Sequence, residues 1–288
     1  MRRRLATSLP LLVAALAPLA CGPTNQYTPL DPDIDPVTEG EWYRPGVDAT
    51  WQWQLLVPEG EAGIDTSYAV EAYDIDLFDT DAAQIAALQA EGHTVICYFS
   101  AGSWEPWRDD ADDFLYDDIG DQLEGWAEER WLNIRSPVVA AIMRSRLDLA
   151  VDKGCDGVEP DNVDGYDNDT GFEITSDDQL AFNRTLANAA HERGLAVGLK
   201  NDLAQVDALV DYYDFSVNEQ CHEYDECAAL EPFTAAQKPV WNAEYVDADS
   251  EEAALAAAED ICPAALAADL RTLILPLDLD DSFRVSCD

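Results

Sequence analysis

The sequence predicts an α/β fold, a (β/α)8 (TIM) barrel, and three observations lead to this prediction. Short apolar stretches that suit buried parallel strands alternate with helical patterns. The apolar stretches number eight. The alternating region extends over roughly 240 residues, which is the usual size of one such barrel. The strands are expected at residues 50–56, 71–78, 94–100, 156–162, 195–201, 214–220, 238–245 and 271–277.

The intervals between these stretches have helical character. Several begin at Ser or Asp and end at Gly, as capped helices do. The helical patterns lie at residues 81–92, 136–154, 176–194, 203–213 and 249–270. A long Trp-rich loop excursion, residues 102–131, follows the third strand. A doubly wound open sheet is the alternative, but it would need a Gly-rich phosphate-binding turn, and the sequence offers no candidate.

The N-terminal region is expected to lie outside the barrel. Residues 1–20 combine three Arg, an apolar run and small residues, which is typical of a bacterial export signal. Cys21 follows Leu19 and Ala20 as in a lipobox, although Pro18 departs from that pattern, so a lipid anchor at Cys21 and ordinary cleavage both stay open. Residues 21–48 are rich in Pro and Asp without apolar periodicity and read as a flexible tether, which leaves residues 49–288 as the single folded domain. The mature protein is therefore expected to be secreted or to be a lipoprotein of the outer membrane or cell surface.

The chain is strongly acidic, with 59 Asp and Glu against 16 Lys and Arg and a formal charge of −43. Such a field repels nucleic acid, so a nucleic-acid partner is excluded, whereas cationic ligands are attracted. Solubility alone is the competing explanation of the charge.

Seven cysteines are present, and six remain when Cys21 is set aside. An even number in an exported protein indicates disulfides. Closeness along the chain favours the pairs Cys221–Cys227 and Cys262–Cys287, which leaves Cys97 with Cys155.

Polar residues follow nearly every expected strand, and this is the end of a barrel where catalytic groups lie. Glycoside cleavage needs two carboxyl groups, and alternation along the strands brings Asp161 and Glu219 to comparable height at the mouth. We expect Asp161 as the nucleophile and Glu219 as the acid/base, with Glu159 deeper, as a partner of Lys200. Trp51, Trp53, Trp104, Trp107 and Tyr245 are candidate platforms for sugar rings, with core packing as the alternative. The expected substrate-binding residues are Trp51, Gln52, Trp53, Tyr98, Trp104, Glu105, Arg108, Asn162, Asp164, Lys200, Asn201, Asp202, Gln220, Glu244 and Tyr245.

A family resemblance supports this interpretation. The stretches SAGSWEPWR (100–108), EPDNVDGY (159–166) and NEQCHEY (218–224), with WQWQL and PVWNAEY, are similar to those of glycoside hydrolase family 114, the endo-α-1,4-polygalactosaminidases. The resemblance covers most of residues 50–277. It implies a barrel that cuts α-1,4-linked galactosamine polymers internally, with one acid on the fourth strand and one on the sixth. Those roles fall on Asp161 and Glu219.

Partly deacetylated galactosamine carries ammonium groups, which an acid-lined groove would attract. Glu105, Asp164, Asp202, Glu223 and Glu244 are the candidates to meet them. An aminated polysaccharide is therefore the expected partner, and retention of configuration is the expected stereochemistry.

Other chemistries have less support in the sequence. No GxSxG elbow, zinc spacing or calcium loop is present, so we expect no metal and no cofactor. Nothing in the sequence indicates a spare apolar face, so we expect a monomer. Two further interpretations stay open: a non-catalytic polysaccharide-binding lipoprotein on the same barrel, and an α-glycosidase of different sugar specificity.

Overall fold

The computed structural model describes residues 30–58, 60, 63–246 and 250–288 of the chain. The expected export signal, Cys21 and the first part of the expected tether lie outside the described residues. Among the described residues, no helix is long and apolar enough to span a membrane.

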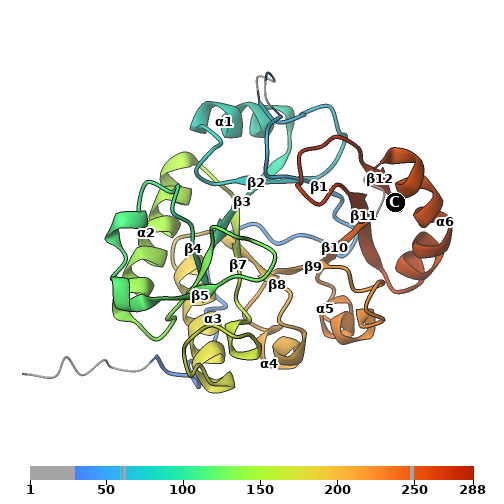
Figure 1. The fold of residues 1–288 in the computed structure, drawn as a ribbon. Helices are drawn as coiled ribbons and strands as arrows, with labels where there is room; N and C mark the ends of the chain where they lie inside the picture. Colours follow the sequence, from blue (N-terminus) through green and yellow to red (C-terminus); the bar gives the residue numbers. More distant parts are fainter. Residues whose placement is uncertain (1–29, 59, 61–62, 247–249) are drawn as a thin grey trace, which may run out of the picture.

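Eight parallel strands follow one another around the molecule, each inside or overlapping a predicted stretch (Figure 1). A short strand, β12 (Val285–Ser286), adds antiparallel to the last of them. The eight strands are β1 (Trp51–Gln54), β2 (Ala72–Asp76), β3 (Thr94–Ser100), β7 (Gly157–Asp161), β8 (Ala196–Lys200), β9 (Phe215–Glu219), β10 (Val240–Tyr245) and β11 (Leu270–Leu275). The predicted barrel class is confirmed.

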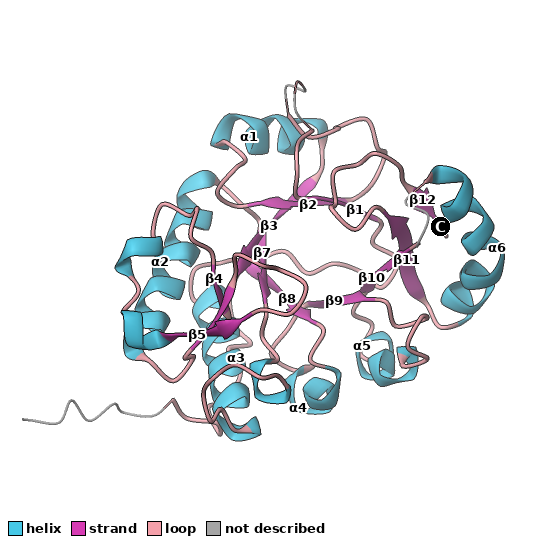
Figure 2. Cartoon of the chain, in the orientation of Figure 1, coloured by secondary structure: helices cyan, strands magenta, loops and turns pink. Residues whose placement is uncertain are grey.

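The helices cover the outside of the curled sheet (Figure 2). Asp81 caps α1 and Ser136 caps α2, as the sequence predicts, whereas Thr175 caps α3, one residue before the expected Ser176. The helix predicted at residues 203–213 is shorter than expected. The helices are α1 (Ala82–Glu91), α2 (Pro137–Lys153), α3 (Ser176–His191), α4 (Val206–Leu209), α5 (Glu231–Ala235) and α6 (Glu251–Ala267).

The seam between the first and last parallel strands is closed by other contacts. Within the described residues, no backbone ladder joins β1 to β11. Instead, the Trp51 indole N–H donates to the carbonyl of Arg271 at 2.8 Å, and the Arg284 guanidinium donates to the carbonyl of Trp51 at 2.9 Å. Leu55 N–H donates to the carbonyl of Leu279 at 3.0 Å. The barrel therefore closes through side chains and loops at this point.

The segment after β3 contains structure of its own. Strands β4 (Ser103–Trp104), β5 (Ile119–Gln122) and β6 (Arg130–Leu132) form a small antiparallel sheet in the order β4-β6-β5. The sheet is tied to the end of β7, because Ala101 and Gly102 donate to the carbonyl of Asp161. A Cβ on Gly102 would lie 1.7 Å from the carbonyl oxygen of Asn162, so only glycine permits this approach. The stretch expected as a loop is thus a folded wall beside the barrel mouth.

The described part of the expected tether also differs from the prediction, because residues 30–48 lie against the barrel. Trp42 stacks on His191 with ring centroids 4.2 Å apart, and its indole N–H donates to Asp214 at 2.9 Å. The side-chain amide of Asn188 accepts from one backbone N–H of the segment at 2.8 Å and donates to one of its carbonyls at 2.9 Å. These contacts fix an irregular segment at the N-terminal end of the strands, opposite the expected mouth.

Three disulfides join Cys97 to Cys155, Cys221 to Cys227 and Cys262 to Cys287. The pairing predicted from spacing is therefore confirmed. The first links β3 to the turn before β7, and the third links α6 to the C-terminal end of the chain.

Candidate active site

Three charged side chains meet at the C-terminal ends of adjacent strands. Asp161 ends β7, Lys200 ends β8 and Glu219 ends β9. The Lys200 ammonium nitrogen lies 3.0 Å from Asp161 Oδ1 and 2.8 Å from Glu219 Oε2. Since both oxygens contact one nitrogen, the sum of these distances, 5.8 Å, is the upper limit of their separation.

Further donors hold each carboxylate. Asp161 accepts from the Tyr98 hydroxyl at 3.2 Å and from the Asn162 backbone N–H at 2.7 Å. Glu219 accepts from the Tyr245 hydroxyl at 2.5 Å and, more distantly, from the Asn201 side-chain amide at 3.4 Å. Both carboxylates are therefore fixed in position before any substrate binds.

The charge on Glu219 follows from these neighbours. Burial alone would raise the pKa of Glu219, but the nearby Lys200 ammonium and the hydrogen bonds from Lys200, Tyr245 and Asn201 outweigh it, so the pKa lies below its ordinary value. Burial opposes the charge on Lys200, yet Asp161, Glu219 and Glu159 hold the pKa of Lys200 well above its usual range. In the free protein, the site is an ion triad with a positive centre.

The backbone turns sharply directly after these strands. Asn162 follows β7 with φ of 58°, Asn201 and Asp202 follow β8 with 45° and 47°, and Gln220 follows β9 with 60°. Left-handed backbone is costly for most residues but is tolerated by Asn and Asp. Successive left-handed positions at three adjacent strand ends mark this rim as a specialised surface.

A second carboxyl pair lies beneath Lys200. Asp74 on β2 and Glu159 on β7 are fully buried, and the Lys200 nitrogen is 3.8 Å from Glu159 Oε1. Among the described residues, no N–H or hydroxyl of another side chain bonds either carboxyl group. Burial raises the pKa of Asp74 to about 8, and burial together with the nearby Asp74 raises the pKa of Glu159 well above its ordinary value. A proton retained on Glu159 lets it donate to Asp74.

Asp161, Lys200 and Glu219 line a cavity of about 290 Å³ at the mouth of the barrel. Its other walls come from Trp53 on β1, the β3–α2 segment and the loop after β11. The expected site residues that line it are Trp53, Tyr98, Glu105, Trp107, Arg108, Asp161, Asn162, Asp164, Lys200, Asn201 and Glu219. The structure therefore brings together most of the predicted site.

A comparison with protein families identifies the chain. The model of glycoside-hydrolase family GH114 matches residues 34–288. The chain belongs to this family. The resemblance noted in the sequence is thereby confirmed, and the chain is a glycoside hydrolase.

Solved structures agree with this assignment. The crystal structure of Aspergillus fumigatus Ega3 in complex with galactosamine is 44% identical, covers 86% of this chain and 99% of its own, and superposes with a TM-score of 0.80. The glycoside hydrolase domain of PelA from Pseudomonas aeruginosa is 14% identical, covers 82% of this chain and 98% of its own, and has a TM-score of 0.64, which shows the shared fold. A search of curated proteins found no match.

Two predicted residues of the first strand lie outside the cavity of this GH114 enzyme. Trp51 is fully buried and stacks on Trp241 with centroids 5.5 Å apart, so it is a core residue and not a sugar platform. Gln52 is also buried and bonds Asp281 and Arg284 at the barrel seam. The cause is the same for both residues: Trp51 packs in the core and Gln52 packs at the seam, so neither side chain reaches the cavity.

Five other predicted residues support the rim from behind. Trp104 packs on the core and donates its indole N–H to a backbone carbonyl at 3.0 Å. Asp202 accepts from the Asn183 side-chain amide on α3 at 2.9 Å. Burial, with nearby acids, raises the pKa of Asp202 to about 8. Glu244 accepts the backbone N–H of His222 at 2.9 Å, Gln220 bonds Glu223 near the surface, and Tyr245 contacts Glu219 without lining the cavity. In this structure these five side chains bond to other parts of the protein and do not line the cavity, and Tyr245 contacts Glu219 directly.

Sequence reasoning missed several cavity residues. Asp76 ends β2 and pairs with Arg108 at 2.7 Å, and its position at a strand end could have revealed it. Trp126 and Glu129 lie in the excursion after β3, where no periodicity indicates which side chains face the barrel. Arg108 also contacts Glu105 at 2.8 Å, so its charge is shared among carboxylates.

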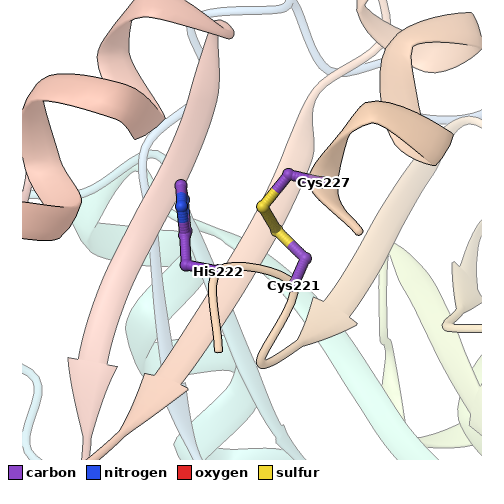
Figure 3. A group of neighbouring side chains, drawn as sticks. All are labelled: Cys221, His222 and Cys227. Atoms are coloured by element: carbon purple, nitrogen blue, oxygen red, sulfur yellow. A yellow bond between two sulfur atoms is a disulfide. The ribbon is translucent and has the colours of Figure 1, made fainter. Parts of the chain in front are cut away.

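Cys221, His222 and Cys227 lie close enough together to suggest a metal site (Figure 3). The two sulfur atoms are joined in a disulfide, so they are not thiolate ligands in this state. Burial lowers the pKa of His222. The Cys221–Cys227 disulfide closes the loop that follows Glu219.

Proposed function

We propose that this GH114 enzyme cleaves α-1,4-linked, partly deacetylated galactosamine polymers internally. The observation that supports this best is the pair of carboxylates bound to one lysine ammonium in the cavity at the barrel mouth. The 44% identical Ega3 was solved with galactosamine, which favours an amino sugar as the substrate here.

Asp161 is the proposed nucleophile and Glu219 the proposed acid/base. In the first step, Asp161 attacks the anomeric carbon while Glu219 gives its proton to the leaving oxygen, which forms a glycosyl ester. In the second step, Glu219 takes a proton from the water that displaces Asp161. The limit of 5.8 Å between the two oxygens suits the spacing of about 5–5.5 Å in retaining enzymes better than about 6.5–9.5 Å in inverting ones.

The low pKa of Glu219 has a consequence for this role. A general acid must be protonated when substrate binds, and this carboxyl gains its proton only as the pH falls toward its depressed pKa. The proposal therefore includes an acidic pH optimum.

Internal cutting is supported by the walls of the cavity. Four lining residues are about half exposed, namely Leu56, Trp107, Trp126 and Leu277, so the lining continues into open surface. A polymer chain can extend past such walls at both ends. We further propose that the enzyme acts as a monomer outside the cytoplasm, where its three disulfides are stable, after removal of residues 1–20, with or without a lipid on Cys21.

Digestion of a partly deacetylated galactosamine polymer, followed by mass spectrometry, tests this proposal. Internal cutting predicts a ladder of oligomers that shortens with time, and unmodified galactan should remain intact. Release of monosaccharide alone would contradict the endo mode, and equal cleavage of neutral galactan would contradict the choice of an aminated substrate.

A further inference from the structure

The turn between β5 and β6 contributes three residues, Leu123, Trp126 and Glu129, to the lining of the catalytic cavity. Trp126 and Glu129 both line the cavity from this turn. Leu123 N–H donates to the Glu129 carbonyl at 3.0 Å, and Glu129 N–H donates to the Trp126 carbonyl at 3.1 Å. The turn is thus closed by its own hydrogen bonds, and it presents an aromatic ring and a carboxyl group from fixed positions.

Glu129 is a buried carboxyl group without a cation of its own. It is 8% exposed, and its Oε2 accepts from the Ser103 hydroxyl at 2.6 Å. No Lys, Arg or His of the described chain forms an ion pair with it, in contrast to Glu105, which lies 2.8 Å from Arg108. Arg108 is already engaged by Asp76 at 2.7 Å. A buried carboxylate that lacks a counter-ion is costly unless a ligand supplies one.

The charged groups around Glu129 favour an incoming cation. Burial, with Glu105 and Asp161, raises the pKa of Glu129 against the Ser103 hydrogen bond and Arg108, to about 7. At the acidic pH proposed for activity, Glu129 therefore holds its proton in the free enzyme and releases it when an ammonium group binds beside it, because a neighbouring cation lowers a carboxyl pKa. Tyr98, whose pKa burial and the nearby acids raise, remains a neutral hydroxyl beside it. Glu105 also lines the cavity, and its buried Oε2 has no hydrogen-bond donor among the described residues, with Arg146 3.6 Å away.

Glu129 is linked to the catalytic residues through hydroxyl groups. The Ser103 hydroxyl lies 2.6 Å from that of Ser100, which accepts from the Asn162 side chain at 2.9 Å. Asn162 directly follows Asp161 and donates its backbone N–H to it. The position of the Glu129 carboxyl is therefore fixed relative to the carboxylate at the end of β7.

We propose that Glu129 binds the protonated amino group of an unacetylated galactosamine unit while the Trp126 ring packs on the apolar face of that sugar. This inference rests on the proposed function, because it assumes that an aminated polymer enters the cavity. An N-acetyl group carries no charge and is larger, so it gains nothing from this carboxylate. Glu129 would thus set the preference of the enzyme for deacetylated units.

The test compares wild type with Glu129→Gln, which keeps the shape and an acceptor for Ser103. The matched control is Glu128→Gln, one residue earlier and exposed. Each protein is assayed on fully deacetylated and on fully N-acetylated galactosamine oligomers of one length. We expect Glu129→Gln to lower kcat/KM on the deacetylated oligomer on the order of 10- to 100-fold, the value of a charge-assisted contact, with little change on the acetylated one. Trp126→Ala should weaken the binding of both oligomers to the same extent.

Other outcomes would overturn the inference. Equal losses on the two oligomers would make Glu129 a structural residue, and no loss on either would exclude it as an amine site. If wild type cleaves neither oligomer, the proposed function fails. Calorimetry of the deacetylated oligomer with wild type and Glu129→Gln then still decides the inference, since unchanged affinity would refute it.

Discussion

Replacement of Lys200 by methionine removes the ammonium group that contacts both Asp161 and Glu219 and leaves a side chain of similar length. The lysine holds the pKa of Glu219 below its ordinary value against the effect of burial. Without it, burial and the neighbouring acids are opposed only by hydrogen bonds from Tyr245 and Asn201. The pKa of Glu219 should therefore rise.

The size of the effect follows from the geometry. An opposite charge within about 4–6 Å commonly lowers a carboxyl pKa by about 1–3 units, and here the contact is 2.8 Å. A general acid with a higher pKa stays protonated to a higher pH, so the basic limb of the kcat/KM profile should move upward by about 1–3 pH units. The maximum rate should fall as well, because Asp161 loses a donor.

The assay is the pH profile of kcat/KM on a soluble deacetylated oligomer. Lys238→Met is the matched control, because Lys238 donates to the carbonyls of Val210 and Tyr213 and has no contact with the site. Its basic limb should stay in place. A limb that does not move in Lys200→Met, or that moves to lower pH, would refute the assignment of Glu219 as an acid controlled by Lys200.

Two further predictions concern stability. In the folded protein Asp74 keeps its proton up to a pKa of about 8, whereas an unfolded Asp releases its proton near pH 4. The free energy of unfolding should therefore decline as the pH rises through this window. Asp74→Asn should remove up to about 1.4 kcal/mol per pH unit of that slope, measured by urea titrations at several pH values. An unchanged slope would contradict the buried proton. Trp42→Ala should lower the melting temperature by roughly 4–8 °C, from about 2 kcal/mol of lost stacking and hydrogen bonding, with activity retained because Trp42 packs at the end opposite the cavity. A variant with unaltered melting would show that this contact contributes nothing to the fold.

The features that could be predicted from sequence were those with a strong local signature. Parallel buried strands give continuous apolar runs, and short spacings limit disulfide choices, so the strands and all three cysteine pairs agree with the structure. Asp161 and Glu219 converge because residues that end neighbouring parallel strands reach the same rim.

The features that could not be predicted depend on how near to the barrel mouth each side chain of a strand lies, and on the packing of irregular segments. Trp51 and Trp53 share one face of β1, but only Trp53 reaches the cavity, and the register that decides this has no signature in the strand itself. Residues 30–48 lack periodicity, yet one tryptophan and a few backbone hydrogen bonds dock them on the barrel. Glu129 was missed because it lies in a segment whose small sheet forms against the barrel, through contacts such as that of Gly102 with the end of β7.

The central claim is that Asp161 and Glu219 act jointly on one linkage, and a cycle of Asp161→Asn, Glu219→Gln and the double variant tests it most directly. Calorimetry first establishes that each variant still binds the deacetylated oligomer. We then expect each single change to lower kcat at least about 10³-fold and the double variant to lose little more, because groups that act as a unit are not additive. Polymer degradation at the wild-type rate by either single variant, or losses that multiply in the double variant, would contradict the account.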